Sequence, residues 1–440
     1  MAFEMTRLFG TNGIRWIIGK RTPDFAVRLG ITAGNFYGPS KKIANGMDPR
    51  TSSPMVFNAV VSGLISTGIN VTDLGMVPTP LVQFAVKRMK LDGGLMVTAS
   101  HNPPEFNGLK FFASDGTELS RAQEEQVERL YAGELATVDW NKVGKCQSET
   151  MIQSTYKNSI KSYLEPGCKN VQVVVDCANG AACDITPDIL TSAGCKVFTL
   201  NSQPDGQFPG RMPEPVEENV GMLMAAVREH GADLGIAHDG DADRATFVDE
   251  KGNYISGDQS LALFALDALK RSGSGTIVVP INTSRMVEDS VKENGGKIEY
   301  TAVGSPLIAR RMMEINAILG GEGNGGIIFP EHQLCRDGMM AAARMINIAA
   351  SHGPLSALVL KLPKYCIRSE KIRISPEIKE QLFEEIRKET EGPVIELDGI
   401  KTVGDDHWVL IRASGTEPII RVTVETQEEG QCVKILEEKV

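Results

Sequence analysis

The chain has 440 residues, which is too long for one ordinary core and predicts several domains. Hydrophobic residues make up 42% of it and charged residues 23%, as in a globular protein that folds in water. The formal net charge of −10 argues against nucleic acid as the main partner, because binding a phosphate backbone needs a basic face. An anionic small substrate would instead need a local cluster of Arg and Lys inside a cleft.

The first residues contain no apolar signal region, and no window approaches the roughly eighteen apolar residues of a membrane-spanning helix. We therefore expect a soluble, cytoplasmic protein with no membrane partner. Eight cysteines are scattered along the chain without a CxxC pair, which is typical of reduced thiols in a reducing compartment.

Three stretches of the chain follow the same pattern, and they begin near Met47, Asp176 and Pro280. In each, a turn is followed by a helix of apolar periodicity, a glycine and a β-branched strand, which is half of a βαβ unit. The pattern predicts three similar α/β domains with mixed or parallel sheets.

After about residue 367 the order of elements changes. A charged helix over 376–391 precedes strands near 408–411 and 419–425 and a closing helix, which predicts a smaller α+β domain. We expect helices over 119–132 and 151–165 to form the first joint between domains. The predicted domain bounds are 1–150, 151–253, 254–366 and 367–440.

The segment 96–112, MVTASHNPPEFNGLKFF, places a serine at the end of a strand. Pro103 and Pro104 forbid a helix directly after the strand, so Ser100 should lie on a stiff loop where α/β sheets bind their ligands. A serine there can act as a nucleophile or carry a phosphate. His101 and Lys110 are the nearby groups that could move a proton or stabilise a phosphoryl oxygen.

The segment 234–250 delivers Asp239, Asp241 and Asp243 from the end of a strand at alternate positions. Unit charges about 4 Å apart repel by about 4 kcal/mol at moderate dielectric, so a divalent cation is the natural counter-charge. Three carboxylates from one loop suit Mg²⁺, with further oxygens supplied from elsewhere, such as a phosphate.

Two other interpretations of this loop can be weighed. An EF-hand is rejected, because Arg244 stands at the sixth place instead of Gly and strands flank the loop. A phosphatase that uses Asp239 as its nucleophile fits the pattern Asp-Gly-Asp, but it leaves Ser100 without a role.

Two further loops could bind a sugar phosphate. In the glycine-rich segment 318–330, Glu322 and Asn324 can hydrogen-bond to neighbouring sugar hydroxyls. In the segment 408–425, Arg412 and Arg421 flank a loop whose N–H groups and hydroxyls can surround one anion. That loop consists of Ser414, Gly415 and Thr416.

Five motifs, in order, resemble those of the α-D-phosphohexomutase family, and the resemblance runs from about residue 7 to residue 425. The motifs are FGTNGIR (9–15), TASHNPP (98–104), DGDADR (239–244), GEGNGG (321–326) and RASGTEPIIR (412–421). The resemblance implies four domains around a central cleft, each of which contributes one loop.

The resemblance also implies roles for the residues in these loops. Ser100 would be the phosphoserine, and its phosphate would join the three aspartates as a ligand of Mg²⁺. Lys110 and Arg15 would lie near the transferring phosphate, with Lys110 or His101 as general acid/base. The expected substrate contacts are Arg244, Glu322 and Asn324 toward the phosphosugar, and Arg412, Ser414, Gly415, Thr416 and Arg421 toward the non-reacting phosphate.

By this resemblance the chain interconverts hexose 6-phosphate and hexose 1-phosphate, with hexose 1,6-bisphosphate as intermediate and activator. Three departures from the commonest pattern concern the choice of hexose: Gly326 in place of His, Ala413 in place of Pro, and Gly304-Ser305-Pro306 in a sugar-facing loop. FGTNGIR is most similar to the phosphoglucosamine mutase branch, and the glycine-rich loop resembles archaeal-type members. Glucose or mannose phosphates remain alternatives, as do a phosphatase and a non-catalytic sugar-phosphate sensor.

Overall fold

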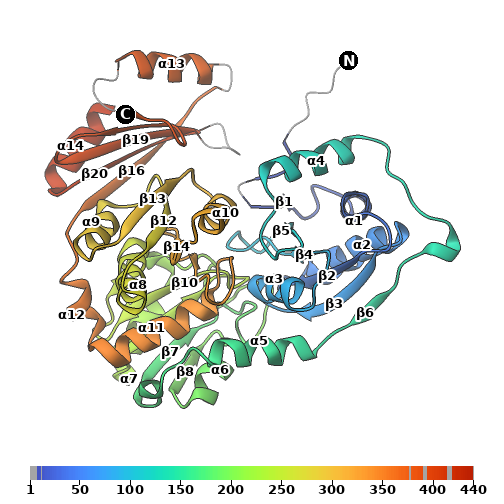
Figure 1. Ribbon diagram of the computed structural model, residues 1–440, viewed down its shortest axis with the longest axis horizontal. Helices are drawn as coiled ribbons and strands as arrows, with labels where there is room; N and C mark the ends of the chain where they lie inside the picture. Colours follow the sequence, from blue (N-terminus) through green and yellow to red (C-terminus); the bar gives the residue numbers. More distant parts are fainter. Residues whose placement is uncertain (1–6, 11, 376–377, 390–393, 414–418, 440) are drawn as a thin grey trace.

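Four separate sheets follow one another along the chain in the computed structural model, which describes residues 7–10, 12–375, 378–389, 394–413 and 419–439 (Figure 1). They contain six, five, four and five strands in the described residues. The first three sheets are mixed and carry helices, whereas the strands of the fourth are antiparallel. This confirms the predicted class of three similar α/β domains and a smaller α+β domain.

The first sheet has the strand order β1-β5-β4-β2-β3-β6. In its centre β2 pairs in parallel with β3 and β4, and β4 turns back antiparallel into β5. The elements are β1 (Ile14–Ile17), α1 (Pro23–Tyr37), β2 (Lys42–Met47), α2 (Ser53–Ser66), β3 (Asn70–Met76), α3 (Thr79–Arg88), β4 (Gly93–Val97), β5 (Phe106–Phe112), α4 (Arg121–Ala132), a 3₁₀ turn (Trp140–Lys142) and β6 (Cys146–Ser148).

The second sheet repeats this arrangement in the order β11-β10-β9-β7-β8. Strand β7 pairs in parallel with β8 and β9, and β9 turns back into β10. The elements are α5 (Met151–Lys161), a 3₁₀ turn (Pro166–Asn170), β7 (Gln172–Asp176), α6 (Thr186–Ala193), β8 (Lys196–Leu200), a 3₁₀ turn (Glu217–Asn219), α7 (Gly221–His230), β9 (Leu234–His238), β10 (Ala245–Asp249) and β11 (Tyr254–Ile255).

The third sheet repeats it again in the order β13-β12-β14-β15. Strand β12 pairs in parallel with β13 and β14, and β14 turns back into β15. The elements are α8 (Gly257–Ser272), β12 (Thr276–Pro280), α9 (Arg285–Glu293), β13 (Lys297–Thr301), α10 (Ser305–Ile315), β14 (Leu319–Gly321), β15 (Ile327–Ile328), α11 (Gly338–His352) and α12 (Leu355–Val359).

Local sequence explains these elements. The central strands are runs of buried β-branched residues, such as Val173–Val175 in β7, because both faces of the sheet are covered. Helices α4 and α8 begin with capping boxes, in which Ser120 and Ser256 exchange hydrogen bonds with the glutamine three residues later. Helix α9 is capped by Ser284, whose Oγ accepts from Met286 N, whereas Ser52 makes no side-chain cap at α2.

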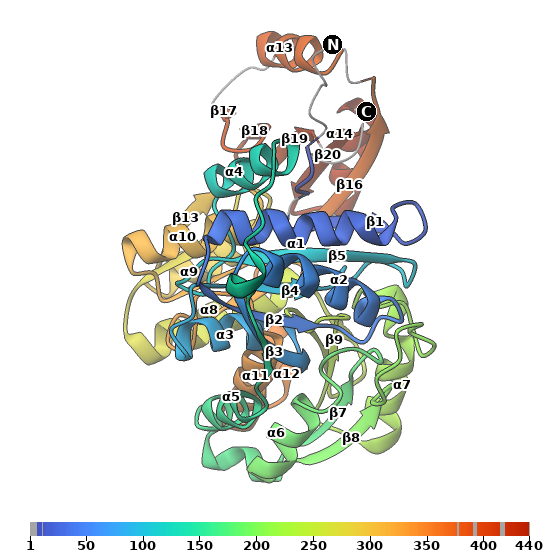
Figure 2. The same cartoon turned by 90° about the vertical axis from the view of Figure 1, so that its right-hand side faces the viewer.

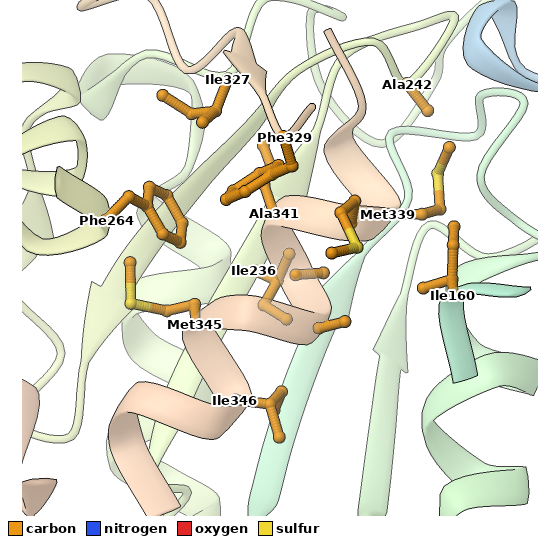
Figure 3. Close-up of a cluster of buried hydrophobic side chains, with 14 of the residues drawn as sticks. Ile160, Ile236, Ala242, Phe264, Ile327, Phe329, Met339, Ala341, Met345 and Ile346 are labelled. Carbon is orange, nitrogen blue, oxygen red and sulfur yellow. The ribbon is translucent and has the colours of Figure 1, made fainter. Parts of the chain in front are cut away.

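Helix α11 forms the centre of the largest apolar core. Its methionines and alanines pack against Ile236 of β9, Phe264 of α8 and Ile327 of β15, side chains from the second and third domains (Figure 3). Residues of α3 in the first domain belong to the same cluster. The loops at the ends of these strands are therefore held in fixed relation to one another.

The fourth domain lies beside the third, near α10 and β13 (Figures 1 and 2). The two predicted helices and two predicted strands correspond to α13, α14, β19 and β20, and the structure adds three strands that the sequence pattern did not indicate. The elements are β16 (Cys366–Arg373), α13 (Lys379–Glu389), β17 (Val394–Ile395), β18 (Ile400–Val403), β19 (His407–Ala413), β20 (Ile419–Thr426) and α14 (Glu429–Lys439).

Trp408 of β19 is at the contact between the third and fourth domains. It packs with Leu410 and Ile281 and is only 1% exposed. Its indole N–H donates to Glu425, which also accepts from the backbone N of Arg285 at the start of α9, at 2.6 and 2.9 Å. Lys401 donates to the carbonyl of Ile281 at 2.7 Å. Apolar burial and hydrogen bonds therefore both hold the two domains together.

Across the described residues, no helix combines the length and the apolar character needed to cross a membrane. All eight cysteines are free thiols.

Candidate active site

The three repeated sheets place the predicted chemistry at equivalent positions. Ser100 lies between β4 and β5, the three aspartates lie between β9 and β10, and Glu322 lies between β14 and β15. Each is the loop that joins the last parallel strand to the antiparallel strand after it. The repeat therefore explains why segments far apart in the sequence can form one site.

Ser100 is held in a conformation that few non-glycine residues adopt. It is fully buried, and its φ of 52° is in the left-handed region, which costs on the order of 1 kcal/mol. Its backbone N donates to Thr98 Oγ1 at 2.8 Å, and its hydroxyl donates to Asp239 Oδ2 at 2.9 Å. His101 Nδ1 lies 3.4 Å from the same hydroxyl. The hydroxyl thus points at the aspartate loop.

Arg50, which sequence reasoning missed, fixes the serine loop. Its guanidinium is fully buried and donates to four carbonyls of that loop, those of Ser100, Asn102, Pro103 and Phe106, at 2.6–3.0 Å. Asp48 Oδ2 accepts from Arg50 Nε at 3.0 Å. The signal in the sequence was a charged Asp-Pro-Arg turn at the end of a buried strand.

The aspartate loop approaches Ser100 closely because Gly240 has no side chain. A Cβ on Gly240 would lie 2.6 Å from the carbonyl oxygen of Ser100, closer than any side chain permits. Asp239, Asp241 and Asp243 are each at most 1% exposed, and one carboxylate oxygen of each lies within 4.8 Å of the others. They form a group that could hold a metal ion.

The hydrogen bonds of the three carboxylates are incomplete. Lys110 Nζ donates to Asp241 and Asp243, both at 2.7 Å, and Thr79 Oγ1 donates to Asp241. Oδ1 of Asp241 and Oδ1 of Asp243 are buried, yet neither has a hydrogen-bond partner among the described residues. Buried oxygens without a donor are costly, and all-oxygen ligands suit a hard divalent cation. The residues present therefore fit a metal of this kind.

The pKa values reflect the crowding of charge. Burial and then the charges of Asp241 and Asp243 raise the pKa of Asp239 to about 8. Burial also opposes ionisation of Asp243, but Arg336, Lys110 and Arg244 outweigh it and lower the pKa of that carboxyl. For Lys110, burial is outweighed by Asp241 and Asp243, which raise the pKa of the amine. The raised pKa of Asp239 reflects crowding of carboxylates that a cation bound there would relieve.

The structure brings the remaining predicted residues of the first two loops together. Arg15 of β1 donates to Asn102 in the serine loop. Arg244 Nε lies 3.8 Å from Asp243 and 4.0 Å from Asp239 and has no hydrogen-bond partner among the described residues. Burial, then Arg244 and Arg15, lower the pKa of His101 to about 2, so its imidazole is neutral at physiological pH.

The glycine-rich loop turns sharply at Gly325, where φ is 88°, and its carbonyl accepts from Ala245 N at 3.1 Å. Asn324 is exposed, and its amide lies 3.4 Å from the buried carboxylate of Glu322. The loop is therefore attached to the strand that follows the aspartates.

Of the residues predicted to bind an anion, Ser414, Gly415 and Thr416 lie outside the described residues. Arg412 and Arg421 are directly opposite each other in the β19–β20 register. Like charges in this arrangement repel unless an anion lies between them. Asp398 accepts from Arg412 Nε at 2.6 Å.

A cavity of about 720 Å³ opens where three domains meet. The first domain contributes Leu119 and Arg121, the third contributes Gly304 and Pro306 of the predicted sugar-facing loop, and the fourth contributes Arg412 among others. A sugar phosphate is small enough to enter it.

Models of one family match the chain in four consecutive parts. They are described as phosphoglucomutase/phosphomannomutase alpha/beta/alpha domains I, II and III and the C-terminal domain, and they match residues 6–137, 154–252, 256–365 and 366–439. The chain belongs to the phosphoglucomutase/phosphomannomutase family. This confirms the predicted resemblance to phosphohexomutases, and the protein is accordingly an isomerase that transfers phosphate.

Relatives of this phosphohexomutase extend over its full length. A phosphoglucomutase/phosphomannomutase of Thermococcus kodakarensis is 41% identical, over 98% of this chain and 97% of the relative. A probable phosphoglucosamine mutase of Methanosarcina barkeri is 42% identical, over 99% and 98%. The crystal structure of a family member from Burkholderia thailandensis has a TM-score of 0.88 at 27% identity and covers 98% of this chain and 95% of that one. These relatives are mutases, and they give the phosphatase alternative no support.

Two residues of this phosphohexomutase that sequence reasoning missed join the predicted loops. Arg336, just before α11, donates to Asp243 at 2.7 Å and to Glu322 at 3.4 Å. Glu118 accepts from Ser305 Oγ at 2.6 Å and also from Asn12. Neither residue belongs to a glycine-rich or acidic motif, so the linear sequence gave no signal for them.

Proposed function

We propose that the protein interconverts hexose 6-phosphate and hexose 1-phosphate through a phosphorylated Ser100 and a hexose 1,6-bisphosphate. The observation that carries this proposal is the hydrogen bond of 2.9 Å between Ser100 Oγ and Asp239, one of three clustered and incompletely bonded carboxylates. A phosphate on Ser100 would place oxygen atoms beside that cluster.

We assign Mg²⁺ to Asp239, Asp241 and Asp243, with a phosphate oxygen on Ser100 as a further ligand. When bound, the ion would neutralise charge on the transferring phosphoryl group. Lys110, which now bonds to two of the carboxylates, would then be free to contact the phosphate instead.

In the transfer itself, the P–O bond to Ser100 breaks and a new P–O bond forms to a hydroxyl of the substrate. The proton of that hydroxyl leaves to a base, and Ser100 Oγ, as the leaving group, takes up a proton to become a hydroxyl. In the second transfer this hydroxyl gives up its proton and forms a P–O bond to the other phosphate of the bisphosphate, while the P–O bond to the sugar breaks and the sugar oxygen is protonated. His101 and Lys110 are the candidates for this proton transfer, because both lie at the serine loop. Arg15 and Arg244 would stabilise the phosphoryl oxygens.

The bisphosphate must turn over between the two transfers, so the site has to bind a sugar in two orientations. Glu322 and Asn324 would hold the hydroxyls, while Arg412, Ser414, Gly415, Thr416 and Arg421 would hold the phosphate that does not react. Added hexose 1,6-bisphosphate would act as an activator, because it restores phosphate to Ser100.

Glucosamine phosphate is the hexose we propose. The relative from M. barkeri is named a probable phosphoglucosamine mutase, and the opening motif FGTNGIR resembles that branch. The name of the T. kodakarensis relative makes glucose and mannose phosphates the alternative.

Turnover of glucosamine 6-phosphate, glucose 1-phosphate and mannose 1-phosphate tests the proposal, with Mg²⁺ and the matching bisphosphate present. We expect wild type to isomerise glucosamine 6-phosphate fastest and Ser100→Ala to be inactive, with phosphate on Ser100 detected by mass spectrometry. Thr98→Ser, which keeps the hydroxyl that supports Ser100, is the control and should remain active.

Two results would contradict the proposal. Release of inorganic phosphate that survives Ser100→Ala would place the chemistry on Asp239, as in a phosphatase. Tight binding of all three sugar phosphates without turnover would make the protein a sensor.

A further inference from the structure

Gly326 of the glycine-rich loop has no side chain, and the side chain of Arg336 fills the space beside it. A Cβ on Gly326 would lie 2.4 Å from Cδ of Arg336 and 3.2 Å from its Cγ, so the arginine side chain occupies the place of any side chain at position 326. The backbone of Gly326 is outside the left-handed region, since it is not among the residues of positive φ. Contact with Arg336 first, and with Asn324 Oδ1 at 3.1 Å second, is therefore what a side chain at position 326 would have to overcome, and not backbone strain.

The guanidinium of Arg336 joins carboxylates from three domains. It is 6% exposed, and its two terminal nitrogens lie 2.7 Å from Asp243 Oδ2, 3.4 Å from Glu322 Oε2 and 3.9 Å from Glu118 Oε1. Glu118 in turn accepts from Ser305 Oγ, at the start of α10 in the predicted sugar-facing loop. The planar guanidinium of Arg336 thus contacts the aspartate loop, the glycine-rich loop and the first domain.

The backbone of Arg336 is fixed before any substrate binds. It pairs with Ile328 in an antiparallel bridge, and the next residue, Asp337, caps α11 by accepting from Met339 N and Met340 N at 3.1 and 3.0 Å. Helix α11 is buried at the centre of the apolar core (Figure 3). The arginine side chain therefore extends from a rigid support, which reduces the entropy cost of holding two carboxylates.

We propose that Arg336 is a positioning residue of the mutase, which orients Glu322 toward the sugar hydroxyls and keeps Asp243 among the metal-binding carboxylates, and that Gly326 is required to admit it. The inference rests on the proposed function. A guanidinium does not give up its proton at physiological pH, so Arg336 acts by orienting its partners and not as an acid or base.

A double-mutant cycle tests this coupling. Arg336→Ala should lower kcat/KM by about 10- to 100-fold, mainly through a higher KM for the sugar phosphate, because Glu322 loses its orientation. Gly326→Ala should lower it on the order of tenfold by displacing the arginine. In the double variant, the alanine at position 326 should add little, since the Arg336 atoms that it would contact are gone and only Asn324 Oδ1, at 3.1 Å, remains close.

Arg344→Ala is the matched control, because Arg344 is equally buried on α11 but pairs with Glu331 away from the loops. It should lower the unfolding temperature without changing KM. Arg336→Lys keeps the charge but can reach only one carboxylate. Its KM should therefore lie between the values of wild type and Arg336→Ala. If Arg336→Ala does not fold, Arg336→Lys tests the orienting role by itself, and a KM equal to that of wild type would overturn it.

Additive losses in the cycle, or equal KM values for wild type and Arg336→Ala, would overturn the inference. Failure of wild type to isomerise any of the three sugar phosphates would instead overturn the proposed function, so the two failures can be told apart.

Discussion

At the scale of single residues, Arg50 decides whether Ser100 can hold its left-handed conformation. Replacing Arg50 by Ala removes a donor from four carbonyls and leaves Asp48 as a buried charge without its ion-pair partner. We expect a loss of about 3–5 kcal/mol in the free energy of unfolding, measured by chemical denaturation. The fraction of this variant that still folds should show a large drop in kcat, because the serine hydroxyl is no longer fixed.

Arg28 provides the control, since it also donates to backbone carbonyls, those of Tyr131 and Gly133, but at an exposed position. Arg28→Ala should cost under about 1 kcal/mol and leave kcat unchanged. If Arg50→Ala were as mild as Arg28→Ala, the serine loop would not depend on Arg50.

Lys110 provides the charge that the three aspartates require in the absence of a metal. Lys110→Met should lower the unfolding temperature in EDTA, because Asp241 loses its ion-pair partner and Asp243 keeps only its arginine partners. We expect Mg²⁺ to raise the unfolding temperature of this variant by more than it raises that of wild type, as measured by calorimetry.

The control for this experiment is Lys41→Met, which removes an exposed ion pair with Asp92. It should cost under about 1 kcal/mol and should not alter the response to Mg²⁺. An equal Mg²⁺ response in Lys110→Met and wild type would show that Lys110 and the metal do not share the carboxylates.

At the scale of elements, the first turn of α8 contains a carboxyl group whose ionisation opposes folding. Burial, with the charge of Glu425, raises the pKa of Asp258 to about 6 although Ser284 N donates to it. Because this pKa is above the unfolded value of about 4, the folded state holds the proton more tightly. The stability due to this proton is fully present below pH 4 and is lost as pH rises through 6.

Asp258→Asn should therefore be more stable than wild type above pH 6 and nearly equal to it at pH 4. Two pKa units correspond to about 3 kcal/mol, and the partial exposure of the side chain reduces this to about 1–2 kcal/mol. Urea denaturation of both proteins from pH 4 to pH 8 measures the difference. A difference that is constant across this range would contradict the assignment to Asp258.

Some of the helices and strands could be predicted from the sequence and others could not. Turn, helix, glycine and strand follow one another in three stretches, so the repeated α/β units were predictable from local patterns. The two-residue strands β15 and β17 and the edge strand β16 were not, because they are fixed by pairing with distant strands and carry no periodicity of their own.

The residues of the candidate site were likewise only partly predictable from the sequence. Ser100, the three aspartates and Glu322 stand in compact motifs whose residue types indicate their chemistry. Arg336 and Glu118 act through contacts across domains, over 93 and 187 residues of sequence, and such contacts exist only after the sheets have formed. Their positions required the structure.

At the scale of the whole molecule, an acidic protein must bind a doubly charged anion. The net charge is −10, but Arg15, Arg244 and Arg336 adjoin the serine and aspartate loops, and Arg421 lies opposite Arg412. At 0.15 M salt the Debye length is about 8 Å, so the near arginines outweigh the distant negative surface. We expect kcat/KM to fall several-fold as KCl rises from about 0.1 to 0.5 M.

Arg421→Gln should flatten this salt dependence as well as raise KM. Arg368→Gln is the control, since Arg368 is exposed on the same sheet but pairs with Glu429. A salt dependence that Arg421→Gln leaves unchanged would place the anion site elsewhere.

Because Trp408 is buried between the third and fourth domains, its fluorescence reports on the contact between them. The chain contains three tryptophans, of which Trp408 is 1% exposed, Trp16 is 8% exposed and Trp140 is 89% exposed. With Trp16 and Trp140 replaced by Phe, the remaining indole emits from an apolar environment, with Lys401 Nζ 4.2 Å from its ring. Separation of the two domains would bring water to this ring and move its emission to longer wavelength. The protein therefore contains its own fluorescent reporter of domain opening, which can be followed during turnover without an attached dye.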